Sequence, residues 1–176
     1  KGQLGHGDEK NKKLPKKGFD SKKLNENQRL LFSNYLKKLK KDSLLNFCII
    51  SFSAKEIDKF GLSKVIKKSI ERGLKKIEAK KEDTILFDGG LKTDILNFPK
   101  QKTIIKGDEK EMVIALASIT AKVLRDRKMI KLGKKYPDYG FEIHKGYGTK
   151  KHYDAIKKYG LLKEHRRSFL GKIVLN

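Results

Sequence analysis

Two aspartates stand where short apolar segments end, and each one adjoins a glycine. Asp88 follows the run 84–87, and Asp108 follows the run 103–105 after a Lys-Gly step. Functional side chains of α/β proteins gather beyond the carboxyl ends of the strands. If these two strands are neighbours, the two carboxylates could share a hard cation such as Mg²⁺ through oxygen ligands. Such cations activate water and offset the charge that builds on a phosphate, which is the chemistry of a nuclease.

The same two aspartates also have simpler interpretations. An aspartate in a turn accepts hydrogen bonds from nearby backbone N–H groups without holding any metal. Asp108 could instead cap the helix that is expected after it. Position alone therefore leaves a metal site and a purely structural turn open for both residues.

The charge of the chain is its strongest bulk property. Lysine and arginine number 44 against 21 acidic residues, which gives a formal net charge of +23. A surface of this kind attracts polyanions and steers them over long range in a salt-dependent way. The charge favours a nucleic-acid partner, and a generally solvated lysine-rich surface is the alternative. It does not separate DNA from RNA, or a binding protein from an enzyme.

Several classes of protein are disfavoured. The longest apolar runs, such as residues 47–50, are far too short to span a bilayer, so we expect no membrane partner. The first residues lack the pattern of a secretory signal. Cys48 is the single cysteine, which excludes an intramolecular disulfide framework and a multi-cysteine zinc site. We expect Cys48 to be a small buried hydrophobe in a protein of the reducing cytoplasm.

The elements that would position the aspartates follow from hydrophobic periodicity. Helical spacing predicts helices at 26–41, 62–79, 111–134 and 150–159, and apolar runs predict strands at 44–52, 84–87 and 103–105. Ser53 and Glu56 form a capping box that would open a short helix. Residues 1–19 have the composition of an irregular basic loop, and residues 136–149 that of a loop rich in glycine, tyrosine and basic residues. Strands that alternate with helices predict one α/β domain over 1–176.

Five blocks of the chain resemble, in their order, the motifs of the ribonuclease HII family. They are DSKKL at 20–24; LFDG at 86–89; KGD at 106–108 with ASITAKV at 117–123 and RDR at 125–127; YPDYGF at 136–141 with HKGYGT at 144–149; and HRRSF at 165–169. A lone KGD would carry little weight. The five blocks together extend from residue 20 almost to the end of the chain.

The resemblance implies a fold and an activity. The fold would be a ribonuclease H-like mixed sheet flanked by helices, with 20–170 as the family-like core. Asp88 and Asp108 would be catalytic, as two of four carboxylates that bind Mg²⁺ or Mn²⁺. The enzyme would hydrolyse the RNA strand of RNA–DNA hybrids, including ribonucleotides embedded in duplex DNA, and leave 5′-phosphate ends. Specificity would come from the 2′-hydroxyl, which distinguishes RNA from DNA.

The resemblance also implies residues that bind nucleic acid. Tyr147 would pack against the sugar at the RNA–DNA junction, with a half-buried tyrosine in a glycine-rich turn as the alternative. Ser21, Lys22 and Lys23 would approach backbone phosphates. Lys1 and Gly2 look like the remnant of a segment that reads the 2′-hydroxyl.

A second group of residues is assigned less specifically. Asp126 lies near the metal site in this family, although between two arginines it could hold only an ion pair. Lys122 could support the site or extend to the surface. Four further basic residues look like phosphate or scaffold contacts: His144, Lys145, Arg166 and Arg167.

The resemblance fails at the start of the chain. The family has an adjacent Asp-Glu pair at the end of its first strand, followed by a second apolar strand. Here residues 1–5 look like the second half of that motif and 6–19 are polar and lysine-rich, so we expect the first strands to be incomplete. Asp8 and Glu9 are the alternative for the missing pair, although no apolar strand precedes them. Residues absent from the sequence, a truncation and a rearranged site stay open as explanations.

The metal-dependent endonuclease is therefore the leading hypothesis. The alternative is a truncated or catalytically inactive relative that binds an RNA–DNA duplex without cutting it. A general RNA-binding protein is a third possibility, but it would not explain acids at the ends of strands. No spare apolar helix face is evident in the sequence, so we expect a monomer.

Overall fold

The computed structural model describes residues 24–89, 95 and 97–171 of the chain. Its elements, in chain order, are α1 (Glu26–Lys41), α2 (Ala54–Phe60), α3 (Leu62–Lys76), β1 (Ile85–Asp88), β2 (Gln101–Ile104), α4 (Gly107–Lys110), α5 (Met112–Lys135), the 3-10 turn η1 (Pro137–Tyr139), α6 (Phe141–His144), α7 (Lys150–Tyr159) and the 3-10 turn η2 (Arg167–Phe169). The two strands pair in parallel, with helices before and after them. The α/β class predicted from the sequence is confirmed.

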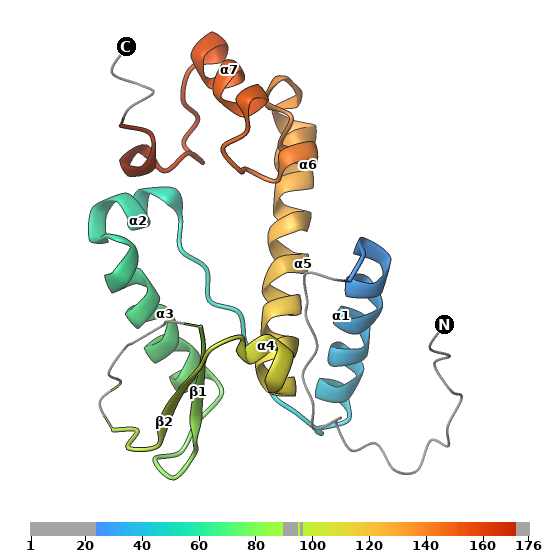
Figure 1. Ribbon diagram of the computed structural model, residues 1–176, viewed down its shortest axis with the longest axis vertical. Helices are drawn as coiled ribbons and strands as arrows, with labels where there is room; N and C mark the ends of the chain where they lie inside the picture. The colour runs from blue at the N-terminus through green and yellow to red at the C-terminus, as the bar shows by residue number, and fades with distance from the viewer. Residues whose placement is uncertain (1–23, 90–94, 96, 172–176) are drawn as a thin grey trace.

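The long helix α5 is the axis of the molecule. Its 24 residues extend over about 36 Å. In Figure 1, α1 lies beside α5, the strands and α4 lie near its N-terminal end, and α6 and α7 lie near its C-terminal end. Helix α5 therefore connects two groups of elements, one packed on its N-terminal part and the other near its C-terminal end.

Two groups of buried side chains correspond to these two parts of α5. Near the start of α5, Met112 and Leu116 pack against Leu36 of α1, with Phe47 at the margin. Near its end, η1, α6 and α7 contribute a separate core made of Tyr139, Phe141, Ala155 and Ile156. Each core holds one end of α5 to a different set of partners.

Most of the predicted elements are present with shifted ends. The helices predicted at 26–41 and 150–159 have those bounds, whereas the one predicted at 62–79 ends at Lys76. The capping box is confirmed, since the Glu56 N–H donates to Ser53 Oγ at 3.2 Å and the Ser53 N–H donates to Glu56 Oε2 at 2.8 Å. The bond from the Ser53 N–H, and a second bond from the Ser53 hydroxyl to the same oxygen at 2.7 Å, lower the pKa of Glu56, the backbone bond having the larger effect. The segment 136–149, predicted as a loop, contains η1 and α6.

The strand predicted at 44–52 is wrong. Among the described residues, the segment forms no strand pairing, and polar contacts join it to helices instead: Lys40 Nζ donates to the Phe47 carbonyl at 2.7 Å, and Cys48 Sγ to the Gly73 carbonyl at 3.5 Å. A short apolar run predicts burial but not the partner that buries it. Here the partners are helices, and Cys48 is half-buried between them rather than fully enclosed.

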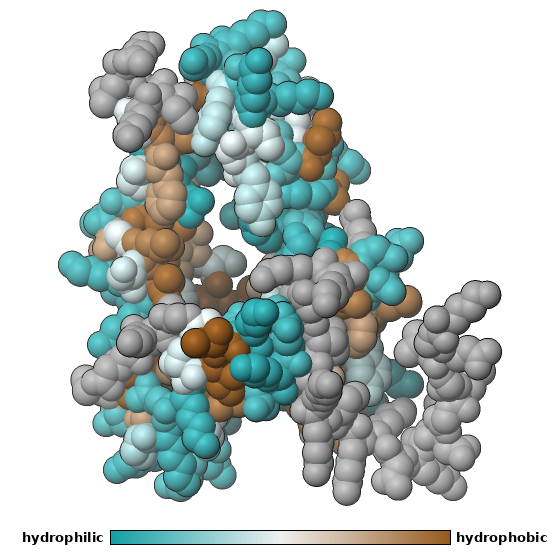
Figure 2. Space-filling model, in the orientation of Figure 1, coloured by the Kyte–Doolittle hydropathy of each residue, from teal (hydrophilic) through white to brown (hydrophobic). Residues whose placement is uncertain are grey.

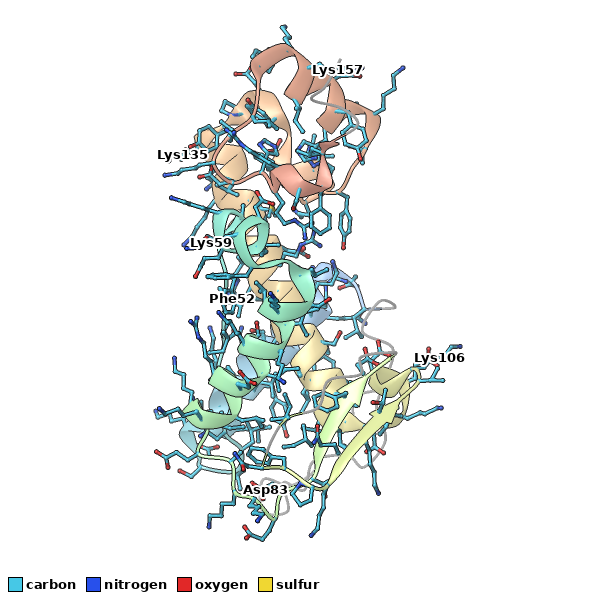
Figure 3. The ribbon with its side chains drawn as sticks, turned by 90° about the vertical axis from the view of Figure 1, so that its left-hand side faces the viewer. Phe52, Lys59, Asp83, Lys106, Lys135 and Lys157 are labelled. Carbon is cyan, nitrogen blue, oxygen red and sulfur yellow. The ribbon has the colours of Figure 1, made fainter. Side chains whose placement is uncertain are left out.

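Charged side chains cover much of the outside of the molecule. Figure 3 shows lysines projecting outward at every level, with Lys106 near the ends of the strands and Lys135 and Lys157 at the opposite end. Figure 2 shows apolar surface along α2 and α3, where Leu62 is exposed, and hydrophilic surface over α7. None of the helices in the described ranges has both the length and the apolar character that a membrane crossing requires.

Candidate active site

The two strands bring their ends to one edge of the sheet. In the parallel pairing, Asp88 lies opposite Ile104, the last residue of β2. The Gly89 N–H continues the ladder by donating to the Ile104 carbonyl at 3.0 Å. Both strands therefore end at the same level, and the residues that follow β2 begin beside Asp88.

A direct hydrogen bond joins Asp88 to the turn after β2. The Gly107 N–H donates to Asp88 Oδ1 at 2.9 Å. Lys106 makes this approach possible because its backbone is left-handed, with φ 54°, and reverses the chain at that point. Asp108 follows directly, so the two aspartates predicted from the sequence lie on adjoining backbone. We call Asp88, Gly107 and Asp108 the carboxylate edge.

Gly107 is closely surrounded. A Cβ at this position would stand 2.7 Å from Ile114 Cδ1 and 3.1 Å from Asp88 Oδ1. A side chain here would therefore press on α5 and on the carboxylate together. The glycine of the KGD block permits the contact between the backbone and Asp88.

The two carboxylates differ in exposure. Asp88 is exposed, whereas Asp108 is 6% exposed and lies inside the short helix α4. The N-cap residue of α5 is Glu111, so Asp108 does not cap the long helix that follows it. The capping alternative is thereby excluded, and Asp108 is a buried acid beside an exposed one.

The chemistry of this edge suits a hard divalent cation, which prefers carboxylate oxygens. Two carboxylates do not complete such a site, however. Within the described ranges, no group of three or more histidine, cysteine, aspartate or glutamate side chains is placed to hold a metal ion. Asp88 and Asp108 fit as part of a larger ligand set, and Asp8 and Glu9 lie outside the described residues.

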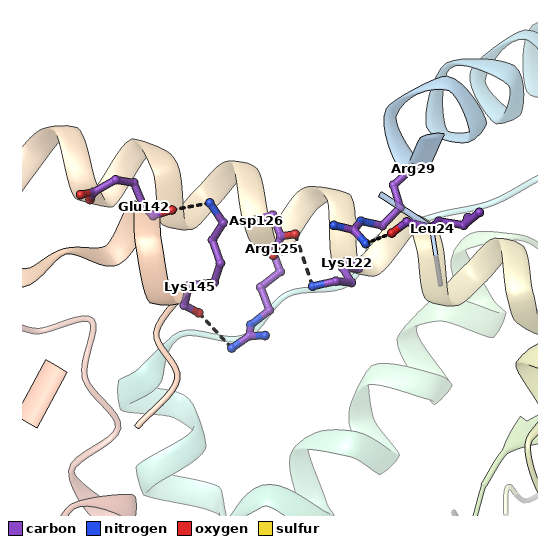
Figure 4. Close-up of polar contacts among 7 residues, drawn as sticks. All are labelled: Leu24, Arg29, Lys122, Arg125, Asp126, Glu142 and Lys145. Atoms are coloured by element: carbon purple, nitrogen blue, oxygen red, sulfur yellow. Dashed lines mark hydrogen bonds and ion pairs between the residues drawn. The ribbon is translucent and has the colours of Figure 1, made fainter. Parts of the chain in front are cut away.

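Asp126 and Lys122 form a second acidic position on α5 (Figure 4). Lys122 Nζ lies 3.4 Å from Asp126 Oδ2. Asp126 is 7% exposed, and its Oδ1 has no hydrogen-bond partner in the part of the chain that the structure describes. This position lies about three turns along α5 from Ile114, which faces Gly107. Asp126 therefore holds an ion pair, as the sequence allowed, but with Lys122 rather than with a flanking arginine.

Tyr147 belongs to the far end of α5. Its side chain is 56% exposed, and the Arg125 guanidinium lies 4.3 Å from the centre of its ring. Arg125 also donates from Nη2 to the Lys145 carbonyl at 3.0 Å, which fixes the guanidinium against the loop (Figure 4). Tyr147 therefore offers one aromatic face to solvent, while an arginine supports the ring.

The remaining predicted residues divide into two groups. Lys1, Gly2, Ser21, Lys22 and Lys23 lie outside the described residues. The backbone of Arg167 belongs to a scaffold contact, because the N–H groups of Arg167 and Ser168 donate to the Asp58 carboxylate of α2 at 2.8 Å and 3.1 Å. These two bonds to Asp58, together with a third from the Ser168 hydroxyl that has the largest effect, lower the pKa of Asp58. The Arg166 guanidinium lies 4.0 Å from the centre of the Phe169 ring.

Sequence reasoning missed three functional features of this region. The contact of Gly107 with Asp88 was not foreseen, although the KGD block contained its glycine. Arg125 is part of the RDR block, but its contact with the Tyr147 ring was not predicted. His152 belongs to none of the five motifs, and its contacts include residues distant in sequence, such as His165.

Comparison with known proteins gives one consistent result. A family model described as ribonuclease HII matches residues 6–172. A ribonuclease HII from Sulfurovum sp. (strain NBC37-1) is 43% identical over 155 residues, which are 88% of this chain and 76% of that protein. One from Acetivibrio thermocellus is 42% identical over 156 residues, 89% of this chain and 58% of the relative. One from Helicobacter acinonychis is 40% identical over 154 residues, 87% of this chain and 78% of the relative.

Proposed function

The chain belongs to the ribonuclease HII family, and from this membership we propose that it is a metal-dependent endonuclease that cuts the RNA strand of RNA–DNA hybrids. Ribonucleotides embedded in duplex DNA would also be cut, with 5′-phosphate ends on the products. The observation that carries the proposal is the hydrogen bond from Gly107 to Asp88, which fixes an exposed carboxylate beside the buried Asp108.

Asp88 and Asp108 would hold Mg²⁺ or Mn²⁺ together with further acids of the chain. When bound, such ions activate water and offset charge on the scissile phosphate. Asp88 is open to solvent and so to substrate, and the Gly107 N–H bonds its Oδ1 and thereby orients the carboxylate. Burial of Asp108 limits its motion and keeps water from competing for its oxygens. Asp126 and Lys122 would stabilise α5 beside the duplex rather than touch the reacting phosphate.

Residues from several parts of the chain would hold the duplex. Tyr147 would pack on the sugar at the RNA–DNA junction, with Arg125 behind the ring. Ser21, Lys22 and Lys23 would contact phosphates, and Lys1 and Gly2 would approach the 2′-hydroxyl. The net charge of +23 supports binding of a polyanion. We further propose a wider ribonuclease H-like mixed sheet around β1 and β2, a monomer, and a cytoplasmic location in agreement with the single cysteine.

One observation favours a second candidate, a relative that binds the duplex without cutting it. In the described part of the chain, no third acid joins Asp88 and Asp108. A pair of carboxylates alone would bind metal weakly, because hard cations take six or more oxygen ligands and carboxylates supply the negative charge.

A cleavage assay separates the two candidates. The substrate is a labelled DNA duplex with one ribonucleotide, incubated with Mg²⁺, Mn²⁺ or EDTA. We expect metal-dependent cleavage at the ribonucleotide, lost in Asp108→Asn and retained in Asp154→Asn, an exposed acid on α7. Cleavage would make Asp8→Asn and Glu9→Gln the next variants. Binding of the duplex without cleavage in either metal would establish the second candidate.

A further inference from the structure

Three histidines meet at the far end of α5, away from the carboxylate edge. His144 ends α6, His152 lies in α7, and His165 precedes η2; their exposed fractions are 9%, 5% and 8%. The rings of His144 and His152 stack with centroids 4.3 Å apart, and Phe141 presents its edge to both. Polar rings so deeply buried need partners for each nitrogen, or the burial is costly.

Every ring nitrogen has a partner, and the partners fix the tautomers. His165 Nδ1 accepts from the Leu162 N–H at 2.9 Å, so the proton of a neutral His165 is on Nε2. His152 Nδ1 lies 3.0 Å from the Tyr147 carbonyl, which only accepts, so the proton of His152 is on Nδ1. The two Nε2 atoms lie 3.1 Å apart, with a proton on His165 and a lone pair on His152.

The result is a chain of hydrogen bonds with one direction. It runs from the Leu162 N–H to His165, from His165 to His152, and from His152 to the Tyr147 carbonyl. We call these groups the histidine chain. Each imidazole must be neutral, since a proton added to either ring would place two N–H groups against each other or remove an acceptor. Burial, the first cause in both cases, lowers the pKa of His152 and of His165 and so supports the neutral forms.

The histidine chain ends on a residue whose backbone is held from both sides. The Tyr147 N–H donates to the His144 carbonyl at 2.9 Å, and the Tyr147 carbonyl also accepts from the Thr149 N–H at 2.9 Å. His144 is itself anchored, because its Nε2 lies 2.7 Å from the Tyr139 carbonyl and its Nδ1 accepts from the Gly146 N–H at 3.1 Å. The direction of the Tyr147 ring therefore depends on this cluster.

We propose that His152 and His165 are positioning residues for Tyr147, holding its carbonyl so that the exposed ring stands where the sugar of a ribonucleotide would meet it. The inference rests on the proposed function of Tyr147 as a contact of the RNA–DNA junction. Neither histidine touches substrate. Each acts through the hydrogen bond that the next group in the histidine chain accepts.

Two matched substitutions at His152 can test this role. In His152→Asn, the side-chain amide can take the place of ring Nδ1 and still donate to the Tyr147 carbonyl. In His152→Gln, the longer amide reaches the place of Nε2, keeps the contact with His165 and leaves that carbonyl without its side-chain donor. Both variants are neutral and polar, and both remove the same stacked ring, so general damage to the packing is shared.

The readout is the ratio of two affinities. The wild type, His152→Asn, His152→Gln and Tyr147→Ala are titrated with a duplex that contains one ribonucleotide and with the all-DNA duplex, in Ca²⁺. We expect His152→Gln to lower the preference for the ribonucleotide by about fivefold, the effect of one average hydrogen bond. His152→Asn should keep the ratio near that of the wild type. A loss of both affinities with an unchanged ratio in His152→Gln would show packing alone and overturn the proposal.

Two further results separate this inference from the function on which it rests. A wild type without preference for the ribonucleotide contradicts the proposed function. A preference that falls in Tyr147→Ala but not in His152→Gln contradicts only the role of the histidines. Independently of any duplex, a long-range ¹H–¹⁵N spectrum of the wild type should show His152 protonated on Nδ1, and His144 and His165 on Nε2. Any other set of tautomers overturns the histidine chain.

Discussion

The carboxylate edge and the histidine chain lie near opposite ends of α5 and are built in opposite ways. The carboxylate edge joins two strand ends through one hydrogen bond, leaves Asp88 exposed and gathers no third metal-binding side chain from the described residues. In the histidine chain, every ring nitrogen already has a partner inside the protein. Asp88 is thus open to solvent, whereas the ring nitrogens of the histidines are all bonded within the protein.

The difference suggests that the carboxylate edge serves the reaction and that the histidine chain serves the structure. Removal of an exposed carboxylate such as Asp88 breaks few internal contacts, so its loss should change activity more than stability. A group whose contacts are all internal should behave in the reverse way, because its removal leaves buried donors and acceptors unpaired. Substitutions at the two ends of α5 therefore test whether each region has the role that its contacts imply.

The largest effect should come from the exposed member of the carboxylate edge. Asp88→Ala should lower the cleavage rate by at least about 100-fold, because a ligand of the metal is lost. The melting temperature should change little, since Asp88 is exposed and its internal partner among the described residues is the Gly107 N–H. Cleavage of a duplex with one ribonucleotide and thermal unfolding are measured on the same preparations. A large loss of stability would make Asp88 a structural residue instead.

The second largest effect should be a loss of stability when His165 of the histidine chain is replaced. His165→Phe keeps an aromatic ring but leaves the Leu162 N–H and His152 Nε2 without partners. Two unpaired buried groups should lower the free energy of unfolding by roughly 2–3 kcal/mol. Urea denaturation measures this change, and cleavage at saturating substrate by the folded fraction should fall much less. Unchanged stability would contradict the closed network.

The third effect tests the steric fit at Gly107. Gly107→Ala places a Cβ 2.7 Å from Ile114 Cδ1 and 3.1 Å from Asp88 Oδ1. The displaced carboxylate should lower kcat by about tenfold, because small errors in position are costly in catalysis. Ile114→Val removes the Cδ1 atom, so the double variant should recover part of the loss. Equal losses in the single and double variants would show that the contact with Ile114 is unimportant.

Local patterns in the sequence predicted that Asp88 and Asp108 stand at the ends of strands, but not the hydrogen bond that joins Gly107 to Asp88. Asp88 and Asp108 each follow a short apolar run, and the parallel pairing of β1 and β2 confirms that those runs are neighbours. The ends of the predicted elements were less accurate, and the apolar run 44–52 was assigned to a strand because periodicity does not identify the partner that buries it. The contact of Cys48 with Gly73, for example, depends on a residue of α3 that lies 25 positions further along the chain.

The histidine chain could not be predicted from local patterns in the sequence. His152 and His165 lie 13 positions apart, and their contact exists only because α7 and the segment before η2 fold onto Tyr139 and Phe141. A histidine on a helix is typical of many roles, and its tautomer is decided by partners that the sequence does not name. The assignment of Tyr147 came from the family motif, and its support by Arg125 came only from the structure.

A smaller effect is expected from pH. The pKa values of His152 and His165 in the folded protein lie below the ordinary value of 6.5, chiefly through burial, with neighbouring His144 acting in the same direction on His152. The unfolded chain therefore binds more protons below pH 6.5, so their contribution to stability is complete above that pH and is lost as the pH falls. The melting temperature should fall by several degrees, about 4–8 °C, from pH 7 to pH 5.

The control for this pH effect is His165→Phe, which has one titrating ring fewer and should show a shallower slope. Glu164 faces His165 and raises its pKa, so the slope should steepen slightly in Glu164→Gln. Asp58 and Glu56 do not interfere, because their lowered pKa values keep both carboxylates ionised in this range. Parallel slopes for the wild type and His165→Phe would contradict the assignment.

The smallest effect should come from Asp58, which links α2 to η2 across more than 100 residues of sequence. Its carboxylate accepts from the N–H groups of Arg167 and Ser168 at 2.8 Å and 3.1 Å, and from the Ser168 hydroxyl. Because these bonds are exposed, Asp58→Asn should lower the melting temperature by only a few degrees, about 2–4 °C. Amide hydrogen exchange should quicken at Arg167 and Ser168 but not at His152. Faster exchange at His152 as well would mean that η2 and the histidine chain open as one unit. The contact between α2 and η2 would then also stabilise the histidine chain.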